Sequence, residues 1–359
     1  MSRSQLEFKG YALTVYEDPH NFLDLKITTV KPKTFSADDV EIQITHCGVC
    51  GSDLHTLKQG WGESKLPLIV GHEIVGHAVR VGDNVKDIKV GDRVGVGAAI
   101  WSCMDCRQCK EGYENYCPQK LSTYNDEYKD GIVTQGGYAS AIRSHHQFVF
   151  PIPDAIESKY AASMMCGGLT VYSPLKVNGA GPGKKVGVIG IGGLGHYAVL
   201  FAKAMGAEVY AFTHSSNKME DAKKLGADHV VDTTDKGFAK PYASTLDILI
   251  STMDATPQLP IREFLSMLYV HGRLINVGIP DMDKPLPTLH AFDLVPNGCY
   301  IGGSGVGSKR ECMDMLRLAA EKDVKPWIQE LPMKDVKKAL EGLGNNTVRY
   351  RFVLSQDLV

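Results

Sequence analysis

The sequence has almost no net charge, because 39 lysine and arginine residues face 41 aspartate and glutamate residues, which leaves −2 at pH 7. A basic surface is the usual electrostatic mark of proteins that bind nucleic acid or anionic membranes. No segment approaches the roughly 20 apolar residues that a membrane span needs. The opening residues MSRSQLE lack the apolar core of a signal peptide, and the chain has no internal repeat. We therefore expect no nucleic-acid partner, no membrane anchor and no export.

The chain has 359 residues, a length that predicts two domains. Residues 1 to about 157 alternate apolar and polar residues between glycines, which predicts a small barrel with long loops. From about residue 159, strand-like and helix-like segments alternate, which predicts an α/β domain with a parallel, doubly wound sheet. Strands are expected at 40–44, 93–96, 185–189, 208–213, 246–251 and 273–278, and helices at 196–205 and 218–225.

Four of the nine cysteines follow the pattern C-x2-C-x2-C-x7-C. Four thiolates on one tight loop suit a single tetrahedral zinc ion with no open position, which indicates a structural site rather than a catalytic one. Two disulfides or an iron–sulfur cluster are the alternatives. Because thiolate ligands need a reducing compartment, we expect a cytoplasmic protein. The four residues are Cys103, Cys106, Cys109 and Cys117.

The glycine-rich segment GIGGLG at 190–195 fits G-x-G-x-x-G, follows a predicted strand and opens a predicted helix. In dinucleotide-binding folds, Gly190 would permit the tight turn and Gly192 the approach of the pyrophosphate, while Gly195 would permit close packing of helix on strand. The N–H groups at the start of the helix would then face the phosphates. A plain structural turn between strand and helix is the alternative.

The end of the next predicted strand indicates which dinucleotide is bound. NAD-binding folds usually place a carboxylate there to hold the ribose hydroxyls, and residues 211–218 contain none. Hydroxyl groups and a lysine would accept a 2′-phosphate, so we predict NADP(H). The alternative is that Ser215 and Ser216 only cap a helix. The predicted 2′-phosphate pocket consists of Thr213, His214, Ser215 and Lys218.

A second set of metal-ligating residues is scattered along the chain: Cys47, Cys50, His72, Glu73 and Cys166. Taken singly, each has an ordinary structural explanation, such as a buried thiol or a hydrogen-bonded core histidine. Two of the sulfurs with the imidazole would form the Cys2His set by which alcohol dehydrogenase holds its catalytic zinc. Such a site leaves a fourth position open and supplies a Lewis acid for hydride transfer.

The chain resembles the zinc-dependent medium-chain alcohol dehydrogenases, and within them the cinnamyl alcohol dehydrogenase branch with its fungal NADP-dependent members. The resemblance covers essentially the whole chain. It rests on the four-cysteine segment, the glycine loop and four further motifs, which are CGVCGSDLH at 47–55, GHE at 71–73, CGGLTVYS at 166–173 and VRYRF at 348–352.

This resemblance implies that Cys50, His72 and Cys166 hold a catalytic zinc, with Glu73 beside the metal as an occasional ligand. Asp53 would hold the imidazole of His72. The resemblance further implies a proton relay, in which Ser52 contacts the reacting oxygen and His55 passes the proton to solvent. A surface histidine near the cofactor is the alternative for His55. Cys47 would be structural.

The cofactor contacts implied by the resemblance extend beyond the glycine loop. The resemblance also implies the fold, which would be a GroES-like β-barrel catalytic domain formed by 1–157 and 306–359, with the zinc lobe at about 100–120, and a Rossmann NADP-binding domain formed by 158–305. A homodimer would form through the sheet edge at 299–302. The implied cofactor-binding residues are Thr170, Gly190, Gly192, Gly193, Leu194, Gly195, Val277, Gly278, Ile279, Ser304 and Arg349.

We therefore expect an NADP(H)-dependent oxidoreductase with two zinc ions per chain that interconverts primary alcohols and aldehydes. Cinnamaldehyde-like and medium aliphatic aldehydes are the expected substrates. Trp61 and Trp101 are candidates for an aromatic-friendly pocket, although either could equally serve packing. Two alternatives belong to other classes: a metal-free, quinone reductase-like medium-chain protein, and a zinc-ribbon binding module. The first would lack the second metal set, and the second would need a basic surface.

Overall fold

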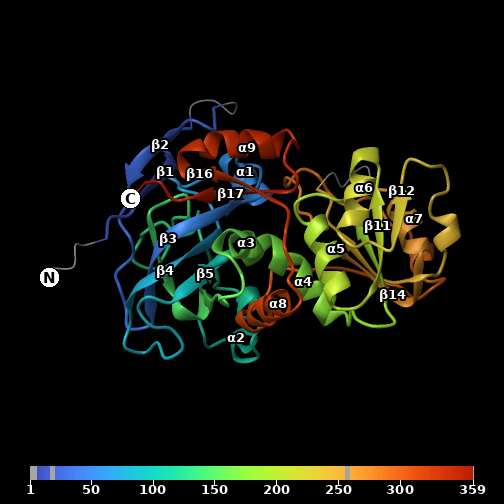
Figure 1. Cartoon of the computed structure of the whole chain (residues 1–359), viewed down its shortest axis with the longest axis horizontal. Helices are drawn as coiled ribbons and strands as arrows, with labels where there is room; N and C mark the ends of the chain where they lie inside the picture. Colours follow the sequence, from blue (N-terminus) through green and yellow to red (C-terminus); the bar gives the residue numbers. More distant parts are fainter. Residues whose placement is uncertain (1–5, 17–20, 255–258, 359) are drawn as a thin grey trace. The chain divides into compact units, whose positions relative to one another are not determined.

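The structure is a computed structural model, and it describes residues 6–16, 21–254 and 259–358. The chain folds into two compact units (Figure 1). Unit 1 comprises Met1–Gly167, Ser308–Ala320 and Trp327–Val359, and unit 2 comprises Gly168–Gly307 and Glu321–Pro326. Among the residues described, no helix is both long and apolar enough to cross a bilayer.

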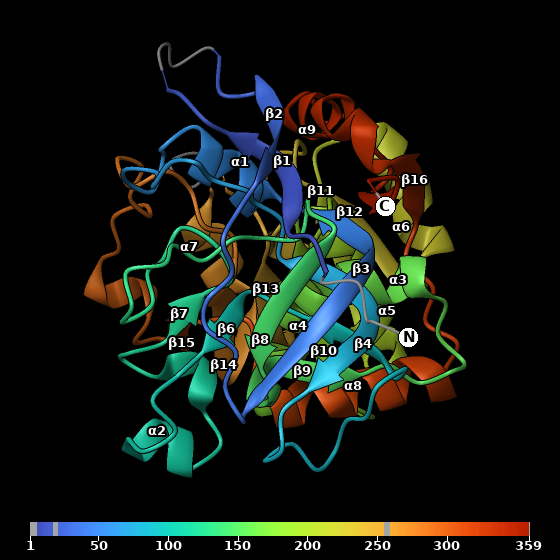
Figure 2. The same cartoon turned by 90° about the vertical axis from the view of Figure 1, so that its left-hand side faces the viewer.

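Unit 1 is built around a seven-stranded sheet. The strand order is β16-β17-β3-β4-β5-β9, and β8 also pairs with β3. Figure 2 shows β8, β3 and β4 side by side. Alternate residues of β3, namely Val40, Ile42 and Ile44, lie in the hydrophobic core of the unit. The strands are β3 (Asp39–Val49), β4 (Glu73–Val81), β5 (Arg93–Val96), β8 (Ala141–His145), β9 (Val149–Pro151), β16 (Ile328–Pro332) and β17 (Arg351–Ser355).

The C-terminal segment completes this sheet. Strand β17 pairs antiparallel with β3, and Phe352 lies opposite Val49. In Figure 1 the red β17 accordingly runs beside the blue β3. Strand β3 therefore has β17 on one side and β4 on the other. This arrangement allows side chains near the two ends of the chain to meet across β3.

The remaining elements of unit 1 surround the sheet. Two short antiparallel pairs, β1 with β2 and β6 with β7, lie outside it. The bounds are β1 (Lys9–Leu13), β2 (Leu25–Thr29), β6 (Ala99–Trp101), β7 (Leu121–Ser122), α1 (Gly51–Leu57), α2 (Arg107–Lys110), α3 (Ser158–Ser163), a π-helix (Met164–Gly168) that ends at the unit boundary, α8 (Lys309–Glu321), most of which is in this unit, and α9 (Val336–Gly344).

Unit 2 contains a six-stranded sheet in the order β12-β11-β10-β13-β14-β15, and every neighbouring pair is parallel. The prediction of a parallel, doubly wound sheet is therefore confirmed. The elements are β10 (Lys185–Ile189), β11 (Glu208–Thr213), β12 (His229–Asp232), β13 (Leu246–Ser251), β14 (Leu268–Asn276) and β15 (Tyr300–Gly303), with α4 (Leu169–Val177), α5 (Gly195–Ala204), α6 (Ser216–Lys224) and α7 (Ile261–Ser266).

The strand order of unit 2 places the glycine loop and the segments that follow β11, β14 and β15 at one edge of the sheet. The chain runs outward from β10 in both directions, to β11 on one side and to β13 on the other. Because all six strands are parallel, the loops that follow them start from the same edge of the sheet. In doubly wound folds, ligands bind at this carboxyl edge, where the strand order reverses.

Candidate active site

The four-cysteine lobe brings its sulfurs to the spacing of a tetrahedral metal site. Cys106 Sγ lies 3.5 Å from Cys109 Sγ and 3.8 Å from Cys117 Sγ, and Cys117 Sγ lies 3.5 Å from Cys103 Sγ. Zinc–sulfur bonds of about 2.3 Å give a tetrahedron with edges of roughly 3.8 Å. Backbone N–H groups, chiefly that of Asp105, lower the pKa of Cys103 to about 6, which favours the thiolate. The residues thus fit a structural zinc ion.

A second, fully buried group lies in unit 1. One ligand atom each from Cys50, His72, Glu73 and Cys166 lies within 4.8 Å of every other. Cys50 ends the turn from β3 into α1, His72 and Glu73 lead into β4, and Cys166 lies in the π-helix. The antiparallel register of β3 and β4 places Gly48 opposite Glu73, which brings the first three residues together. Cys47 is buried outside this group.

The two thiols of this group have opposite shifts in pKa, since that of Cys166 is raised well above its ordinary value, chiefly by its hydrogen bond to Cys50. A hydrogen bond from the Cys166 thiol lowers the pKa of Cys50 well below its ordinary value. Burial by itself lowers the pKa of His72, but the Asp53 carboxylate outweighs burial and raises that pKa well above the ordinary range, so the imidazole would release a proton on binding a metal. A thiolate is the form of cysteine that binds zinc. Two sulfurs, one imidazole and one carboxylate form a donor set that fits zinc with three or four protein ligands.

Asp53 orients two of these donors at once. Its Oδ1 accepts hydrogen bonds from the backbone N–H of Gly71 at 3.0 Å and from Nδ1 of His72 at 3.2 Å. Its Oδ2 accepts the backbone N–H of Cys50 at 2.9 Å and the hydroxyl of Tyr138 at 2.7 Å. Since Nδ1 of His72 is held by the carboxylate, Nε2 is left as the ligating nitrogen. This geometry supports the orienting role expected of Asp53.

Two tyrosines and an arginine of this site were not predicted from the sequence. The hydroxyl of Tyr138 bonds Asp53, and that of Tyr124 lies 3.1 Å from His72 Nδ1. The guanidinium of Arg351 donates to Glu73 Oε1, which also accepts the backbone N–H of Gly167 at 3.0 Å. None of the three lies in a metal-ligand pattern. For Arg351 the only sequence signal was its place in the VRYRF motif.

The predicted relay residues lie on α1. Ser52 and His55 are three positions apart on this helix, so they share one face. Ser52 Oγ lies 3.7 Å from Cys50 Sγ, which places the hydroxyl beside the ligand group. The His55 ring stacks on Trp61 with centroids 4.8 Å apart and an angle of 7° between the planes. Trp101 instead ends β6, where it packs against the core of unit 1.

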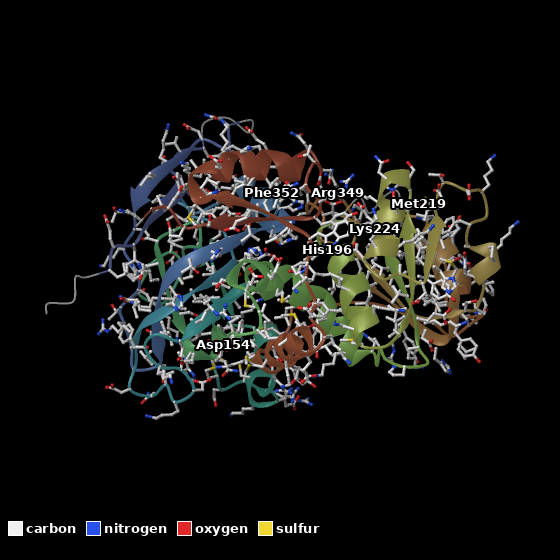
Figure 3. All side chains as sticks on the ribbon, viewed as in Figure 1. Asp154, His196, Met219, Lys224, Arg349 and Phe352 are labelled. Carbon is white, nitrogen blue, oxygen red and sulfur yellow. The ribbon has the colours of Figure 1, made fainter. Side chains whose placement is uncertain are left out.

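The glycine loop of unit 2 has the backbone geometry that the motif needs. Gly190 has φ +85°, which a residue with a side chain rarely adopts. A Cβ on Gly192 would meet no atom within 4 Å, whereas one on Gly195 would lie 1.9 Å from the carbonyl oxygen of Gly190. The buried His196, labelled in Figure 3, lies with Nδ1 3.2 Å from the Gly192 carbonyl oxygen. The backbone at Gly192 is thus accessible to a ligand, whereas at Gly195 the helix packs so closely on the loop that no side chain fits.

The predicted 2′-phosphate pocket follows β11. Ser215 occupies the position before α6, but its side chain makes no capping hydrogen bond there. Thr213 Oγ1 accepts the backbone N–H of Ser215 at 3.2 Å. Ser215 thus occupies the N-cap position that the alternative explanation assigns to it, but without the capping hydrogen bond from its side chain. His214 is exposed, and Lys218 lies in the first turn of α6.

The other predicted cofactor residues lie in both units. Val277, Gly278 and Ile279 follow β14, and Ser304 follows β15, both at the carboxyl edge of the sheet. Gly193 and Leu194 complete the loop before α5, and Thr170 is buried in α4. Arg349, labelled in Figure 3, precedes β17 in unit 1.

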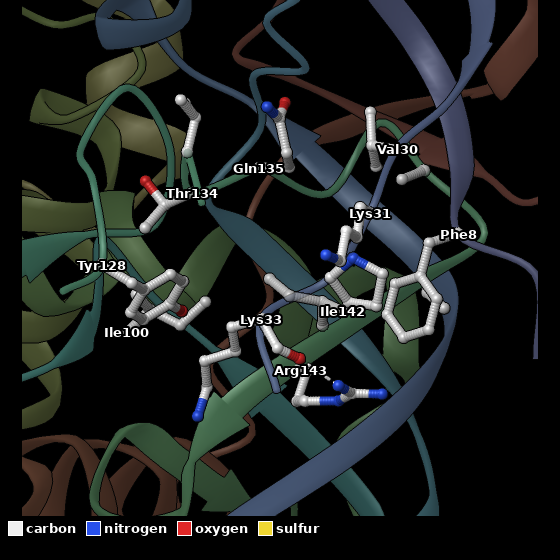
Figure 4. Close-up of a pocket in the computed structure, with 14 residues that line it drawn as sticks. Phe8, Val30, Lys31, Lys33, Ile100, Tyr128, Thr134, Gln135, Ile142 and Arg143 are labelled. Atoms are coloured by element: carbon white, nitrogen blue, oxygen red, sulfur yellow. Dashed lines mark hydrogen bonds between the residues drawn. The ribbon is translucent and has the colours of Figure 1, made fainter. Parts of the chain in front are cut away.

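A crevice in unit 1 is separate from these residues. It has a volume of about 30 Å³ and is lined in part by residues 30–33 (Figure 4). Such a volume has room for about one water molecule. Lys33 and Arg143 beside it are paired with Asp39 and Glu41. The crevice is therefore too small for an aldehyde and a nicotinamide.

Comparisons with known proteins identify the family. Residues 36–154 match the alcohol dehydrogenase GroES-like domain, and residues 193–321 match the zinc-binding dehydrogenase domain. The chain is 44% identical over 352 residues to NADP-dependent alcohol dehydrogenase 6 of Saccharomyces cerevisiae, which covers 97% of this chain and 96% of the relative. Cinnamyl alcohol dehydrogenase 3 of Arabidopsis thaliana is 44% identical and covers 88% of this chain and 84% of its own length.

Solved structures agree with these relatives. A cinnamyl alcohol dehydrogenase from Sorghum bicolor has a TM-score of 0.90 at 37% identity, over 97% of each chain. A Helicobacter pylori enzyme of this type, complexed with NADP(H), has a TM-score of 0.88 at 32% identity and covers 98% of this chain and 99% of its own. The chain belongs to the zinc-binding medium-chain alcohol dehydrogenases of the cinnamyl alcohol dehydrogenase type.

Proposed function

We propose that this alcohol dehydrogenase uses NADPH to reduce aldehydes to primary alcohols, with a catalytic zinc at Cys50, His72 and Cys166 and a structural zinc in the four-cysteine lobe. The buried four-residue group supports this proposal most strongly, because it offers three ligands and a carboxylate. A metal-free, quinone reductase-like protein would not need such a group. Since none of the nine cysteines, all of which lie in the described ranges, forms a disulfide, we also propose a reducing, cytoplasmic location.

The bound groups would supply the reactive chemistry: zinc is a Lewis acid that polarises a carbonyl, and NADPH is a hydride donor. The protein's own residues would do the rest. Asp53 fixes the imidazole of His72 in one tautomer and holds the backbone at Cys50. Ser52 would hold the proton that the new alcohol oxygen needs. His55, on the same face of α1, would replace that proton from solvent.

The substrate class follows from the names of the relatives and from one ring. Relatives from Arabidopsis and Sorghum are named for cinnamyl alcohol. Trp61 stacks on the relay residue His55 and thus offers an aromatic surface near the proposed proton path. We propose that cinnamaldehyde-like substrates are preferred and that medium aliphatic aldehydes are also reduced. A panel of both kinds, followed by the loss of NADPH absorbance, tests this choice; no turnover with any aldehyde would contradict it.

Cofactor choice can be tested at Ser215. We expect kcat/KM for NADPH to exceed that for NADH, because no carboxylate follows β11 to repel a 2′-phosphate. Ser215→Asp should lower kcat/KM with NADPH by about a hundredfold, since like charges brought together cost several kcal/mol. NADH turnover in the same variant is the internal control and should be retained. Equal losses with both cofactors would indicate damage to the fold, and equal wild-type activity with NADH would contradict the proposal.

We also propose a homodimer formed through the edge strand β15. Tyr300 on this strand is 56% exposed, and the apolar Phe292 and Val295 nearby in the sequence are exposed as well. Exposed edge strands with apolar side chains are prone to pair with a second copy. Analytical ultracentrifugation should give twice the chain mass of 39.2 kDa. Tyr300→Glu should lower the measured mass towards that of one chain, whereas Val177→Glu, a matched change at an exposed position on α4, should leave the mass unchanged. A monomeric wild type would refute the dimer.

A further inference from the structure

The ion pair between Glu73 and Arg351 lies across β3. Glu73 begins β4 and Arg351 begins β17, and these strands flank β3 on opposite sides. The two side chains are 0% and 3% exposed. They can meet because Gly48 of β3 has no side chain: a Cβ there would lie 2.1 Å from Glu73 Oε2. Three successive strands thus combine to place one carboxylate.

The two oxygens of Glu73 have different surroundings. Oε1 accepts hydrogen bonds from the guanidinium of Arg351 and from the backbone N–H of Gly167. Oε2 is buried and has no hydrogen-bond partner in the part of the chain that the structure describes. A buried carboxylate oxygen without a partner is costly, unless a cation is close to it. The neighbouring group of Cys50, His72 and Cys166 is where such a cation would be held.

Charge balance gives the arginine a specific task. Two thiolates would neutralise a divalent ion, so the two buried carboxylates, Asp53 and Glu73, would both be negative charges in excess; Asp53 is held by two backbone N–H groups, a tyrosine and the imidazole, whereas Glu73 lies beside a guanidinium. The fixed positive charge of Arg351 compensates Glu73, which keeps this carboxylate from depending on the metal for its counter-charge. Without the guanidinium, the ion would be the nearest cation available to Glu73.

The geometry points to Arg351 as a positioning residue that holds the Glu73 carboxylate back from the metal, so that the fourth position at Cys50, His72 and Cys166 stays open to an incoming ligand. This inference rests on the proposed function, because it presupposes a metal in that group. It predicts that the arginine acts through Glu73 alone. Loss of Arg351 would then weaken the binding of an added ligand only while a carboxylate is present at position 73.

Imidazole binding to the protein with cobalt(II) at this group measures how open the position is. In Arg351→Gln the Glu73 carboxylate would occupy the position for most of the time, and the apparent Kd for imidazole, read from the visible cobalt bands, should rise about tenfold. Adding Glu73→Gln should return the Kd to within about twofold of wild type. Arg351→Lys, which keeps the charge, should give an intermediate value.

Two further variants keep the test decisive. In Gly48→Ala the added methyl group would displace the Glu73 carboxylate from its place over β3 without removing a charge, and the imidazole Kd should rise. This variant tests the inference even if Arg351→Gln fails to fold. Arg143→Gln is the matched control, since it breaks a similarly enclosed pair with Glu41 in the same unit, outside the ligand group. It should destabilise the protein without changing the imidazole Kd.

The outcomes separate this inference from the proposed function. An unchanged Kd in both Arg351→Gln and Gly48→Ala overturns it, and so does a raised Kd that persists after Glu73→Gln is added to Arg351→Gln. Wild-type protein that shows no cobalt bands at this group would instead refute the catalytic metal site, and the inference would fall with it. A tenfold rise that Glu73→Gln reverses would establish the positioning role.

Discussion

Cys166→Ala is expected to lower kcat/KM for aldehyde reduction by at least about a thousandfold, because Lewis-acid stabilisation by a catalytic metal amounts to several kcal/mol. Cys166 is one of only two sulfurs in the buried group, and its thiol is also the hydrogen-bond donor that lowers the pKa of Cys50. Its removal therefore also removes a group that stabilises the Cys50 thiolate before a metal binds. Elemental analysis should find two zinc ions in the wild type and one in the variant, since the four-cysteine lobe is untouched.

The neighbouring thiol of Cys47 provides the matched control. It is fully buried in the same unit but lies outside the ligand group. Cys47→Ala removes one buried sulfur, should cost about 1 kcal/mol of stability, and should leave both zinc ions and most of the activity. If Cys166→Ala retained two zinc ions and wild-type turnover, the catalytic site would have to lie elsewhere. One zinc ion in the wild type would favour the quinone reductase-like alternative, which lacks the catalytic metal.

Predicting the fold from the sequence succeeded where the pattern was local. The strands predicted at 93–96, 185–189, 208–213 and 246–251 coincide with β5, β10, β11 and β13. All four strands are buried along most of their length and are bounded by charged, polar or glycine residues, so the apolar run by itself marks their ends. The helix predicted at 218–225 starts two residues early, at Ser216 in α6.

Strand β14 shows why other bounds were missed. It was predicted at 273–278 and runs over Leu268–Asn276. Its first half contains the exposed Tyr269 and Val270, and His271 has a positive φ of 60°. The register with β13 shifts at this point, so the alternation of buried and exposed residues is broken. A pattern that assumes a regular strand cannot find a strand that begins with a bulge.

The site residues also divide into those that local spacing predicts and those that only tertiary contacts bring together. Spacing alone predicted the four-cysteine lobe, because its ligands are close in sequence. The convergence of Cys50, His72 and Cys166 depends on strand pairing and on the π-helix, so it needed the resemblance. The pairing of Arg351 with Glu73 and of Tyr138 with Asp53 could not be found from the sequence, because these partners are reached across the sheet; the VRYRF motif marked Arg351 without giving it a role. Buried hydrogen bonds of this kind have no sequence period.

Ser52→Ala is the second change with a large expected effect. It should lower kcat in both directions by roughly 10²–10⁴-fold, the range typical of a lost acid–base group. Ser52 Oγ lies 3.7 Å from Cys50 Sγ, and His55 shares its face of α1. Because alanine is a good helix former, α1 should persist, and the zinc content should stay at two ions per chain. The loss would therefore be a loss of proton transfer and not of metal.

A conservative variant and an isotope effect complete the argument about Ser52. Ser52→Thr keeps a hydroxyl at the same position in the first turn of α1, and should recover a large part of the activity. In Ser52→Ala the solvent deuterium isotope effect on kcat should increase, because protonation of the new alcohol becomes the slow step. His55→Ala should weaken activity less, since solvent can replace a histidine at the outer end of the path more easily than it can replace a hydroxyl beside the buried ligand group. Turnover in Ser52→Ala within about threefold of wild type would remove the hydroxyl from the mechanism and leave proton delivery to water.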